Sequence, residues 1–173
     1  MEIVLAKSAG FCFGVRRATQ MAFEAAAEHE NICSLGPVIH SPQVVKRLAE
    51  QGVSVVADVE DIPPGSVIVR SHGVTLEEMS SIQDKNLTIV DATCPFVKKA
   101  QEYAAGLSKE GYTVIIVGEM EHPEVQGIVS YSGNAVVHVV ADAEQAVALP
   151  RMKKVGIVAQ TTQLYENLKD VMD

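Results

Sequence analysis

Hydrophobic and polar positions along the chain alternate between two patterns, one typical of buried strands and one typical of amphipathic helices. Short runs rich in Val and Ile predict strands at residues 2–6, 31–35, 53–57, 66–70, 87–90, 112–117, 135–140 and 154–159. Apolar residues spaced three or four positions apart predict helices at residues 14–29, 42–51, 75–84, 95–110, 123–131, 142–149 and 162–173. Strands and helices that alternate in this way predict an α/β fold with mostly parallel sheets.

Local signals support several of these boundaries. Ser41 followed by Pro42 is typical of a helix start, and Thr75 with Glu78 has the spacing of a capping box. Gly52 and Gly111 directly follow predicted helices, where glycine often ends a helix. These residues therefore support the predicted helix starts near residues 42 and 75 and the predicted helix ends near residues 51 and 110.

The chain contains an internal repeat. The segment that begins at Cys12 resembles the segment that begins at Cys94, 82 residues later, and a Gly-x-x-x-His pattern ending at His40 recurs at His122 with the same offset. Two further matches follow in the same order. We therefore expect two pseudo-symmetric α/β units, residues 1–94 and 95–173. The last predicted helix reaches Asp173 without a closing Gly or Pro, which suggests that a further part of the protein is missing.

Composition and charge narrow the function classes. Apolar residues make up 47% of the chain, which excludes disorder as its main state. With 14 basic and 22 acidic side chains the net charge is −8, so general binding to nucleic acid or anionic membrane is not expected. No apolar run approaches the roughly 20 residues of a membrane span. Three cysteines without an export signal indicate a reducing compartment, which we expect to be the cytoplasm.

Two of the three cysteines occupy matched positions in the repeat. Cys12 and Cys94 are each predicted to follow a strand and to open a helix, where free N–H groups and the helix dipole favour a thiolate. Thiolates ligate soft metals and iron–sulfur clusters. Cys33 has no counterpart in the second copy and lies within a predicted strand, so we interpret it as a core residue.

Three histidines are expected at the carboxyl ends of parallel strands, where open α/β sheets place ligands. His40, His72 and His122 each follow an apolar run and stand near a predicted helix start. They are candidates for phosphate binding, and equally for zinc binding. His29 and His138 lack this context, and we interpret them as structural or solvated residues.

Two further polar residues are candidates for the same site. Glu124, two residues after His122, is a candidate proton donor, because a carboxyl group partly shielded from water can hold and deliver a proton. The alternative is an ordinary acidic residue in the first turn of a helix. Thr161 either contacts a substrate hydroxyl or caps the last helix.

Several segments carrying these residues resemble a known family. The segments 10–15, 71–74, 91–95, 122–127 and 160–162 together resemble 4-hydroxy-3-methylbut-2-enyl diphosphate reductase, the LytB/IspH-type enzyme of the non-mevalonate isoprenoid pathway. The resemblance covers the whole chain in order. It implies three similar α/β units around a 4Fe–4S cluster held by three cysteines. It further implies a reductive dehydroxylation that yields isopentenyl and dimethylallyl diphosphate.

The resemblance also implies roles for individual residues. Cys12 and Cys94 match two cluster ligands, and Glu124 matches the proton donor. The substrate-binding residues implied by the family are His40, His72, His122 and Thr161. The family's third cysteine lies beyond Asp173, so we expect this chain to be a fragment with impaired activity, in which the cluster is absent or degraded. The family suggests a ferredoxin or flavodoxin as the electron donor.

Two other function classes remain open from the residues. One is a non-catalytic module that binds zinc or phosphate through the histidines. The other is a Cys–His acyl- or thiol-transfer enzyme with Cys12 or Cys94 as its nucleophile, although the sequence shows no specific base for it.

Overall fold

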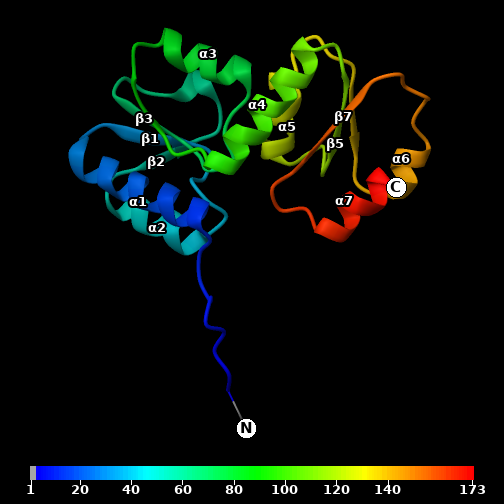
Figure 1. The fold of residues 1–173 in the computed structure, drawn as a ribbon. Helices are drawn as coiled ribbons and strands as arrows, with labels where there is room; N and C mark the ends of the chain where they lie inside the picture. The colour runs from blue at the N-terminus through cyan, green and yellow to red at the C-terminus, as the bar shows by residue number, and fades with distance from the viewer. Residues whose placement is uncertain (1–2) are drawn as a thin grey trace.

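The computed structural model describes residues 3–173 and contains two parallel sheets side by side (Figure 1). The elements of the first half are α1 (Phe13–Glu28), β1 (Ile32–Leu35), α2 (Pro42–Glu50), β2 (Ser54–Val56), the 3₁₀ helix η1 (Val59–Asp61), β3 (Ser66–Val69), α3 (Leu76–Asp84) and β4 (Thr88–Asp91). Those of the second half are α4 (Pro95–Lys109), β5 (Thr113–Val117), α5 (Pro123–Tyr131), β6 (Val137–Val140), α6 (Ala143–Val147), β7 (Val155–Ala159) and α7 (Tyr165–Met172).

The two sheets share one pattern of strand pairing. The first has the order β2-β1-β3-β4 and the second the order β6-β5-β7, and every pair is parallel. In each sheet, the strand that comes first in the sequence lies between the next two strands of that sheet. The predicted α/β class with parallel sheets is therefore confirmed. Because all strands of a sheet run the same way, their carboxyl ends meet at one edge.

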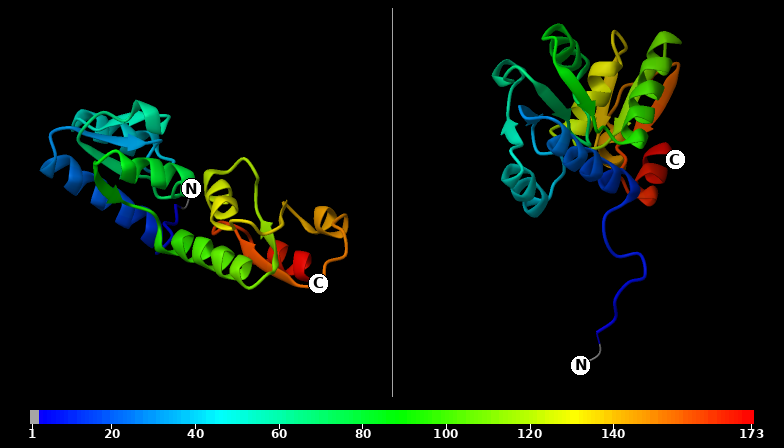
Figure 2. Two further views of the ribbon diagram at one scale, coloured as in Figure 1. Left: turned by 90° about the horizontal axis from the view of Figure 1, so that it is seen from above. Right: turned by 90° about the vertical axis from the view of Figure 1, so that its left-hand side faces the viewer.

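Helices cover both faces of each sheet (Figure 2). In the first sheet, α1 and α2 pack on one face, and α3 with η1 packs on the other. In the second, α4 and α5 cover one face, and α6 and α7 cover the other. The central strands β1 and β3 are buried along their full length, which explains why their sequences are mostly apolar and do not alternate between apolar and polar residues.

The predicted strand at residues 2–6 is wrong for residues 3–6, and residue 2 lies outside the described residues. Residues 3–6 have no regular structure and extend away from both sheets, with Ile3, Val4 and Leu5 strongly exposed (Figure 1). The sequence has strand character, but a strand needs a neighbour, and no strand of the described residues pairs with this segment. Cys12 therefore opens α1 after an irregular segment and not after a strand.

Most helix boundaries agree with the local signals. Thr75 and Glu78 form the full capping box of α3, with the Glu78 N–H donating to Thr75 Oγ1 and the Thr75 N–H donating to the Glu78 carboxylate. Ser41 is the N-cap of α2, although its hydroxyl makes no capping hydrogen bond. The last helix begins at Tyr165 and not at residue 162, because Thr161 and Thr162 form a turn after β7.

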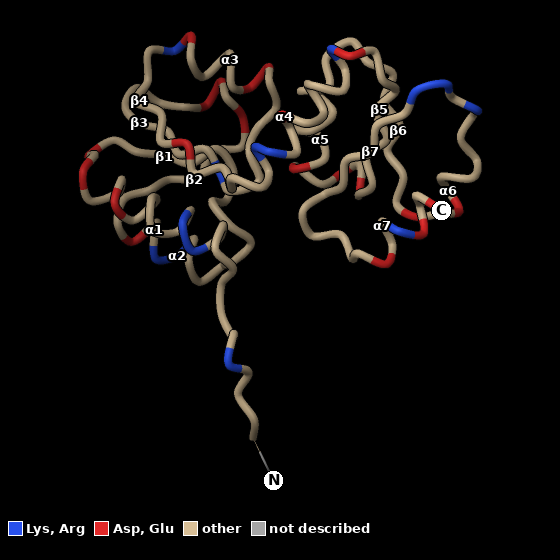
Figure 3. The backbone as a smooth tube through the Cα atoms, viewed as in Figure 1, with Lys and Arg blue, Asp and Glu red and all other residues tan. Residues whose placement is uncertain are grey.

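Lys and Arg positions are scattered singly and in pairs over both halves of the molecule (Figure 3). In the described part of the chain, no helix is both long and apolar enough to cross a membrane.

Candidate functional site

His40, His72 and His122 come together, although they are 32 and 50 residues apart in sequence. One ligating nitrogen of each ring lies within 4.8 Å of those of the other two. The centroids of the His40 and His72 rings are 4.3 Å apart, and the His122 ring lies 5.4 Å from the His72 ring and 6.0 Å from the His40 ring. The first half of the chain supplies two of these rings and the second half supplies the third, so the cluster spans the two sheets.

His72 is a partly buried member of this cluster. Burial and, to a lesser extent, charge repulsion from the nearby His40, His122 and Arg70 together lower the pKa of His72 from 6.5 to about 4. His72 is therefore neutral at pH 7. A neutral imidazole can donate one hydrogen bond and accept another.

A hydrogen bond from the backbone determines which ring nitrogen of His122 accepts and which one donates. It is the N-cap of α5, and its Nδ1 accepts a hydrogen bond from the Glu124 N–H at 3.2 Å. A neutral ring that accepts at Nδ1 carries its proton on Nε2. The outward atom of His122 is thus an N–H donor beside a helix N-terminus, an arrangement that suits an anion.

Glu124 is buried and bound by Thr161 through two hydrogen bonds. Its side chain is 1% exposed. The backbone N–H of Thr161 donates to Oε1 at 2.6 Å, and the Thr161 hydroxyl donates to Oε2 at 2.9 Å. These bonds tie the start of α5 to the end of β7. Glu124 is therefore not an ordinary solvated acid of a first helical turn, and Thr161 does not cap α7.

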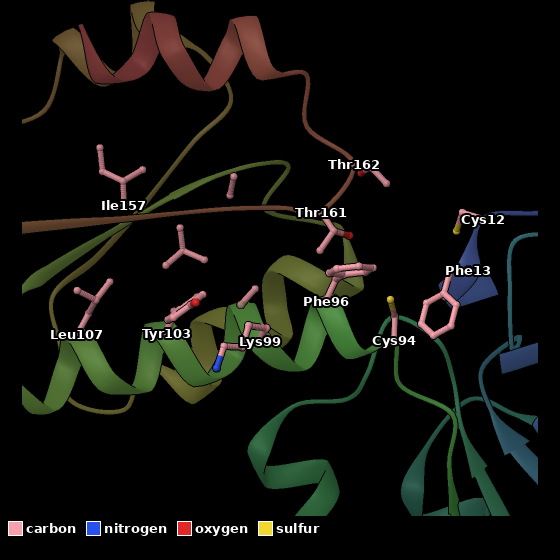
Figure 4. Close-up of a pocket in the computed structure, with 14 residues that line it drawn as sticks. Cys12, Phe13, Cys94, Phe96, Lys99, Tyr103, Leu107, Ile157, Thr161 and Thr162 are labelled. Atoms are coloured by element: carbon pink, nitrogen blue, oxygen red, sulfur yellow. The ribbon is translucent and has the colours of Figure 1, made fainter. Parts of the chain in front are cut away.

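Thr161 also lines a mainly apolar cavity of about 870 Å³ that holds two cysteines (Figure 4). Cys12 is the N-cap of α1 and is exposed, and Cys94 is the N-cap of α4 and is partly exposed. Neither side chain makes a capping hydrogen bond. Both thiols lie at one end of the cavity beside Phe13, and Thr161 lines the same cavity from the turn after β7 (Figure 4). Hydrogen bonds therefore link the histidine cluster to Glu124 and Thr161, and Thr161 shares its cavity with the cysteines.

The approach of the two helix starts depends on Gly14. A Cβ atom at this position would lie only 2.4 Å from the Cys94 sulfur. An added Cβ atom would force the Cys94 side chain or the start of α1 to shift, so glycine favours this close packing of α1 against Cys94.

The donor atoms around the cavity suit a soft metal centre. The described residues that line the cavity include the two thiols but no Asp, Glu or His side chain. Thiolates are the usual ligands of iron–sulfur clusters, so the chemistry of Cys12 and Cys94 fits part of the ligand set of such a cluster.

The remaining cysteine and histidines lie elsewhere. Cys33 is fully buried in β1, and burial raises the pKa of its thiol, so it behaves as a core residue. His29 is the C-cap of α1 and His138 lies in β6, and neither joins the histidine cluster.

Two polar residues that support the site were not identified from the sequence. Gln160 is buried, and its side chain accepts a hydrogen bond from the Glu119 N–H at 3.1 Å and donates one to the Thr162 hydroxyl at 3.0 Å. Arg70 is partly buried at the end of β3 and donates from Nε to the Gly73 carbonyl at 3.2 Å. The feature of the sequence that could have identified Arg70 and Gln160 is that each is a polar residue directly after an apolar run.

Comparison with known proteins identifies relatives over the whole described chain. The model of the LytB protein family matches residues 3–173. The chain is 62% identical over 173 residues to a 4-hydroxy-3-methylbut-2-enyl diphosphate reductase of Syntrophotalea carbinolica, and 62% identical over 172 residues to the reductase of Geobacter sulfurreducens. These matches cover 100% and 99% of this chain but 62% and 61% of the relatives. The chain therefore spans about three-fifths of their length.

Solved structures give the same relationship. One is a structure of (E)-4-hydroxy-3-methyl-but-2-enyl diphosphate reductase, the terminal enzyme of the non-mevalonate pathway, with a TM-score of 0.85, 43% identity, and coverage of 98% of this chain and 61% of that one. Another is the E-1-hydroxy-2-methyl-but-2-enyl-4-diphosphate reductase of Plasmodium falciparum, with a TM-score of 0.88, 27% identity, and coverage of 96% and 53%.

Proposed function

Because the chain belongs to the LytB protein family, we propose that it forms part of a reductase that converts 4-hydroxy-3-methylbut-2-enyl diphosphate to isopentenyl and dimethylallyl diphosphate. One observation supports this most directly. The candidate groups are linked to one another in space. His122 of the histidine cluster accepts a hydrogen bond from the Glu124 backbone, and Glu124 is hydrogen-bonded to Thr161. Thr161 in turn lines the same cavity as the two thiols. An anion site, a proton source and soft metal ligands are the three components that this reaction needs.

The diphosphate binds at the histidine cluster in this proposal. Nε2–H of His122 donates to a phosphate oxygen, and the neutral His72 ring supplies a second donor. His40 and His122 stand beside the N-termini of α2 and α5, whose positive dipole ends stabilise the negative charge. The site attracts a dianionic group even though the net charge of the chain is −8, because these interactions act at short range.

Glu124 delivers a proton through Thr161. The carboxyl group itself is buried, whereas Thr161 is exposed to the cavity. Protonation of Glu124 at Oε2 reverses the hydrogen bond between that oxygen and Thr161, so that Glu124 donates to Oγ1. Oγ1 then accepts the Glu124 proton while the Thr161 hydroxyl gives its own proton to the substrate hydroxyl. The hydroxyl then leaves as water. The overall step consumes two electrons and two protons for each water released.

Cys12 and Cys94 hold two positions of a 4Fe–4S cluster in this proposal, and a third cysteine comes from the part of the relatives that this chain does not cover. A bound cluster would pass two electrons, one at a time, from the electron donor to the substrate and would offer an iron without a cysteine ligand for the substrate hydroxyl. The rings of Phe13 and Phe96 line the cavity beside the thiols. We propose that a ferredoxin or flavodoxin in the cytoplasm reduces the protein, and that this chain alone has impaired activity.

We further propose that residues 1–94 and 95–173 are two copies of one unit and that the full protein has three. The shared strand orders β2-β1-β3 and β6-β5-β7 support the repeat. The division falls at Cys94, directly before α4 begins.

The role of Glu124 is tested with Glu124→Gln in the protein at the full length of its relatives. The variant retains the shape of the side chain but holds no transferable proton, so we expect substrate binding to persist while turnover falls by about a hundredfold or more. Glu121→Gln, in the exposed turn before His122, is the matched control and retains turnover. Unchanged turnover in Glu124→Gln contradicts the assignment.

The ligand role of the cysteines is tested by anaerobic reconstitution with iron and sulfide. Cys12→Ser and Cys94→Ser should lose the visible absorbance of the cluster, whereas Cys33→Ala should retain it, because Cys33 lies in the core of the first sheet. A cluster that survives in both serine variants contradicts the assignment.

A zinc-binding module is the second candidate function, because the three histidine nitrogens are close enough to share one metal ion. The hydrogen bond from the Glu124 N–H to Nδ1 of His122 opposes it, since that bond leaves the proton on Nε2. Calorimetry with ZnCl₂ and with pyrophosphate separates the two candidates. Tight stoichiometric zinc binding without pyrophosphate binding favours the zinc module.

A further inference from the structure

Arg70 contacts both glycine turns that carry the histidines of the first sheet. Its Nε donates to the Gly73 carbonyl at 3.2 Å, and Gly73 directly follows His72. Its Nη1 lies 2.6 Å from the point that a Cβ atom on Gly36 would occupy, and Gly36 opens the turn that ends at His40. Both glycines have positive φ angles, +69° at Gly36 and +74° at Gly73. One side chain therefore lies between two turns that only glycine forms readily.

The charge of Arg70 has no close acidic partner. Among residues 3–173, the two ion pairs within 4.0 Å are Lys98–Asp91 and Lys99–Glu102, and neither involves Arg70. Glu78 acts on the guanidinium from a longer distance, and burial lowers the pKa of Arg70, although an arginine retains its charge at neutral pH. A partly buried cation without a paired carboxylate is stabilised when an anion binds nearby.

We propose that Arg70 is a positioning residue of the diphosphate site, which sets the spacing of His40 and His72 and adds a permanent positive charge behind them. The proposal rests on the proposed function for the identity of the anion. The distance of 4.3 Å between the two rings is the quantity that Arg70 maintains, because it contacts the turn on which each ring is mounted. Arginine suits this role better than lysine, since its planar group can donate to a carbonyl while its face packs against a glycine.

The charge of Arg70 also acts on His72. The charged and titratable groups that act on this imidazole are His40, His122 and Arg70. Each of them disfavours a proton on His72. Removal of the guanidinium should therefore raise the pKa of His72, an effect that a purely structural role of Arg70 does not require.

The test compares Arg70→Met and Arg70→Lys with Arg47→Met in the same chain. Arg47 is an exposed arginine of α2 that stacks on Phe23, so its variant removes one positive charge without touching the histidines. Calorimetry with inorganic pyrophosphate at pH 7 measures affinity, and NMR of the histidine rings measures the pKa of His72 and the environments of His40 and His72. Urea denaturation establishes that each variant is folded.

We expect Arg70→Met to weaken pyrophosphate binding by about tenfold or more, to raise the pKa of His72 and to shift the ring signals of both histidines. Arg70→Lys restores the charge without the planar geometry, so it should recover the pKa of His72 and only part of the affinity. Arg47→Met should bind within about twofold of the unmodified chain.

Failure of this proposal differs from failure of the proposed function. If the unmodified chain binds no pyrophosphate, the diphosphate assignment fails, and the role of Arg70 is then decided by the NMR signals alone. If a folded Arg70→Met variant retains its affinity within about twofold and leaves the ring signals unchanged, Arg70 does not position the histidines.

Discussion

At the scale of single residues, the site is built from polar side chains whose partners are backbone groups. His122 accepts from the Glu124 N–H, and Glu124 accepts from the Thr161 N–H. Each of these hydrogen bonds restrains the orientation of a side chain before any ligand arrives. Hydrogen bonds of this kind cost little further entropy on binding, which is the physical basis of a preorganised site.

The neutrality of His72 makes stability depend on pH. Its pKa is about 4 in the folded chain, against 6.5 ordinarily, so between these values the unfolded chain binds a proton that the folded chain does not. The neutral His72 therefore makes its full contribution to the free energy of unfolding above pH 6.5, and this contribution is lost as the pH falls towards 4. We expect His72→Gln to flatten the dependence of unfolding free energy on pH in this window, measured by urea denaturation.

His29→Gln is the control for this prediction, because His29 lies at the end of α1, outside the cluster. Its profile should match that of the unmodified chain. An equal slope in His72→Gln and in the unmodified chain contradicts the prediction.

At the scale of elements, the site depends on helix starts that approach one another closely. Gly14 allows the first turn of α1 to pack against the Cys94 sulfur at the start of α4. Gly73 and Gly127 similarly leave room for the buried amide of Gln101, which would lie 3.0 Å from a Cβ atom at either position. Small residues at these points bring the two halves of the chain together.

We expect Gly14→Ala to destabilise the chain by about 1–3 kcal/mol, because the added methyl group overlaps the Cys94 sulfur and separates the two helix starts. Gly106→Ala is the matched control. It lies within α4 with no atom within 4 Å of its Cβ position, so alanine should stabilise the helix by about 0.5–1 kcal/mol. Thermal unfolding measures both effects, and equal midpoints for the two variants contradict the expectation.

The sequence was sufficient to predict most elements and the convergence of the histidines. Apolar runs such as Val67–Val69 identify buried parallel strands, and parallel strand ends share one edge, so residues that follow them gather there. The predicted strand was wrong for residues 3–6, because Ile3, Val4 and Leu5 have strand propensity but lack a pairing partner among the described residues.

Contacts between distant polar residues could not be predicted in the same way. The bonds of Thr161 to Glu124 and the position of Arg70 between two glycine turns depend on how strand ends and loops meet in three dimensions. Periodicity reports which face of an element is buried, but it carries no information on which polar groups pair across it.

At the scale of the whole molecule, aromatic side chains are exposed around the cysteine cavity. Phe13 is 60% exposed, Phe96 64% and Tyr103 59%, and all three line the same cavity. Isolated exposed apolar residues are common on protein surfaces, but a group of large rings around one hollow marks a surface that associates with other apolar groups.

We therefore expect this chain to self-associate as its concentration rises, measured by sedimentation velocity. Phe96→Ser with Tyr103→Ser should shift the distribution towards monomer with little change in unfolding free energy, since both rings are already exposed. Val136→Ser with Val147→Ser, two exposed residues outside the cavity, should leave the distribution unchanged. A chain that stays monomeric at all concentrations contradicts this prediction.

The division of the histidines between the two sheets has a consequence for the order of folding. The strands of each sheet are contiguous in sequence, residues 32–91 and 113–159, so either sheet can complete its core before the other. His122 meets His40 and His72 only where the two sheets are docked, so the proposed anion site is complete only in the docked molecule. An anion that binds there would add its binding free energy to the docked state. We therefore expect a rising anion concentration to favour the unfolding of both sheets in one cooperative transition.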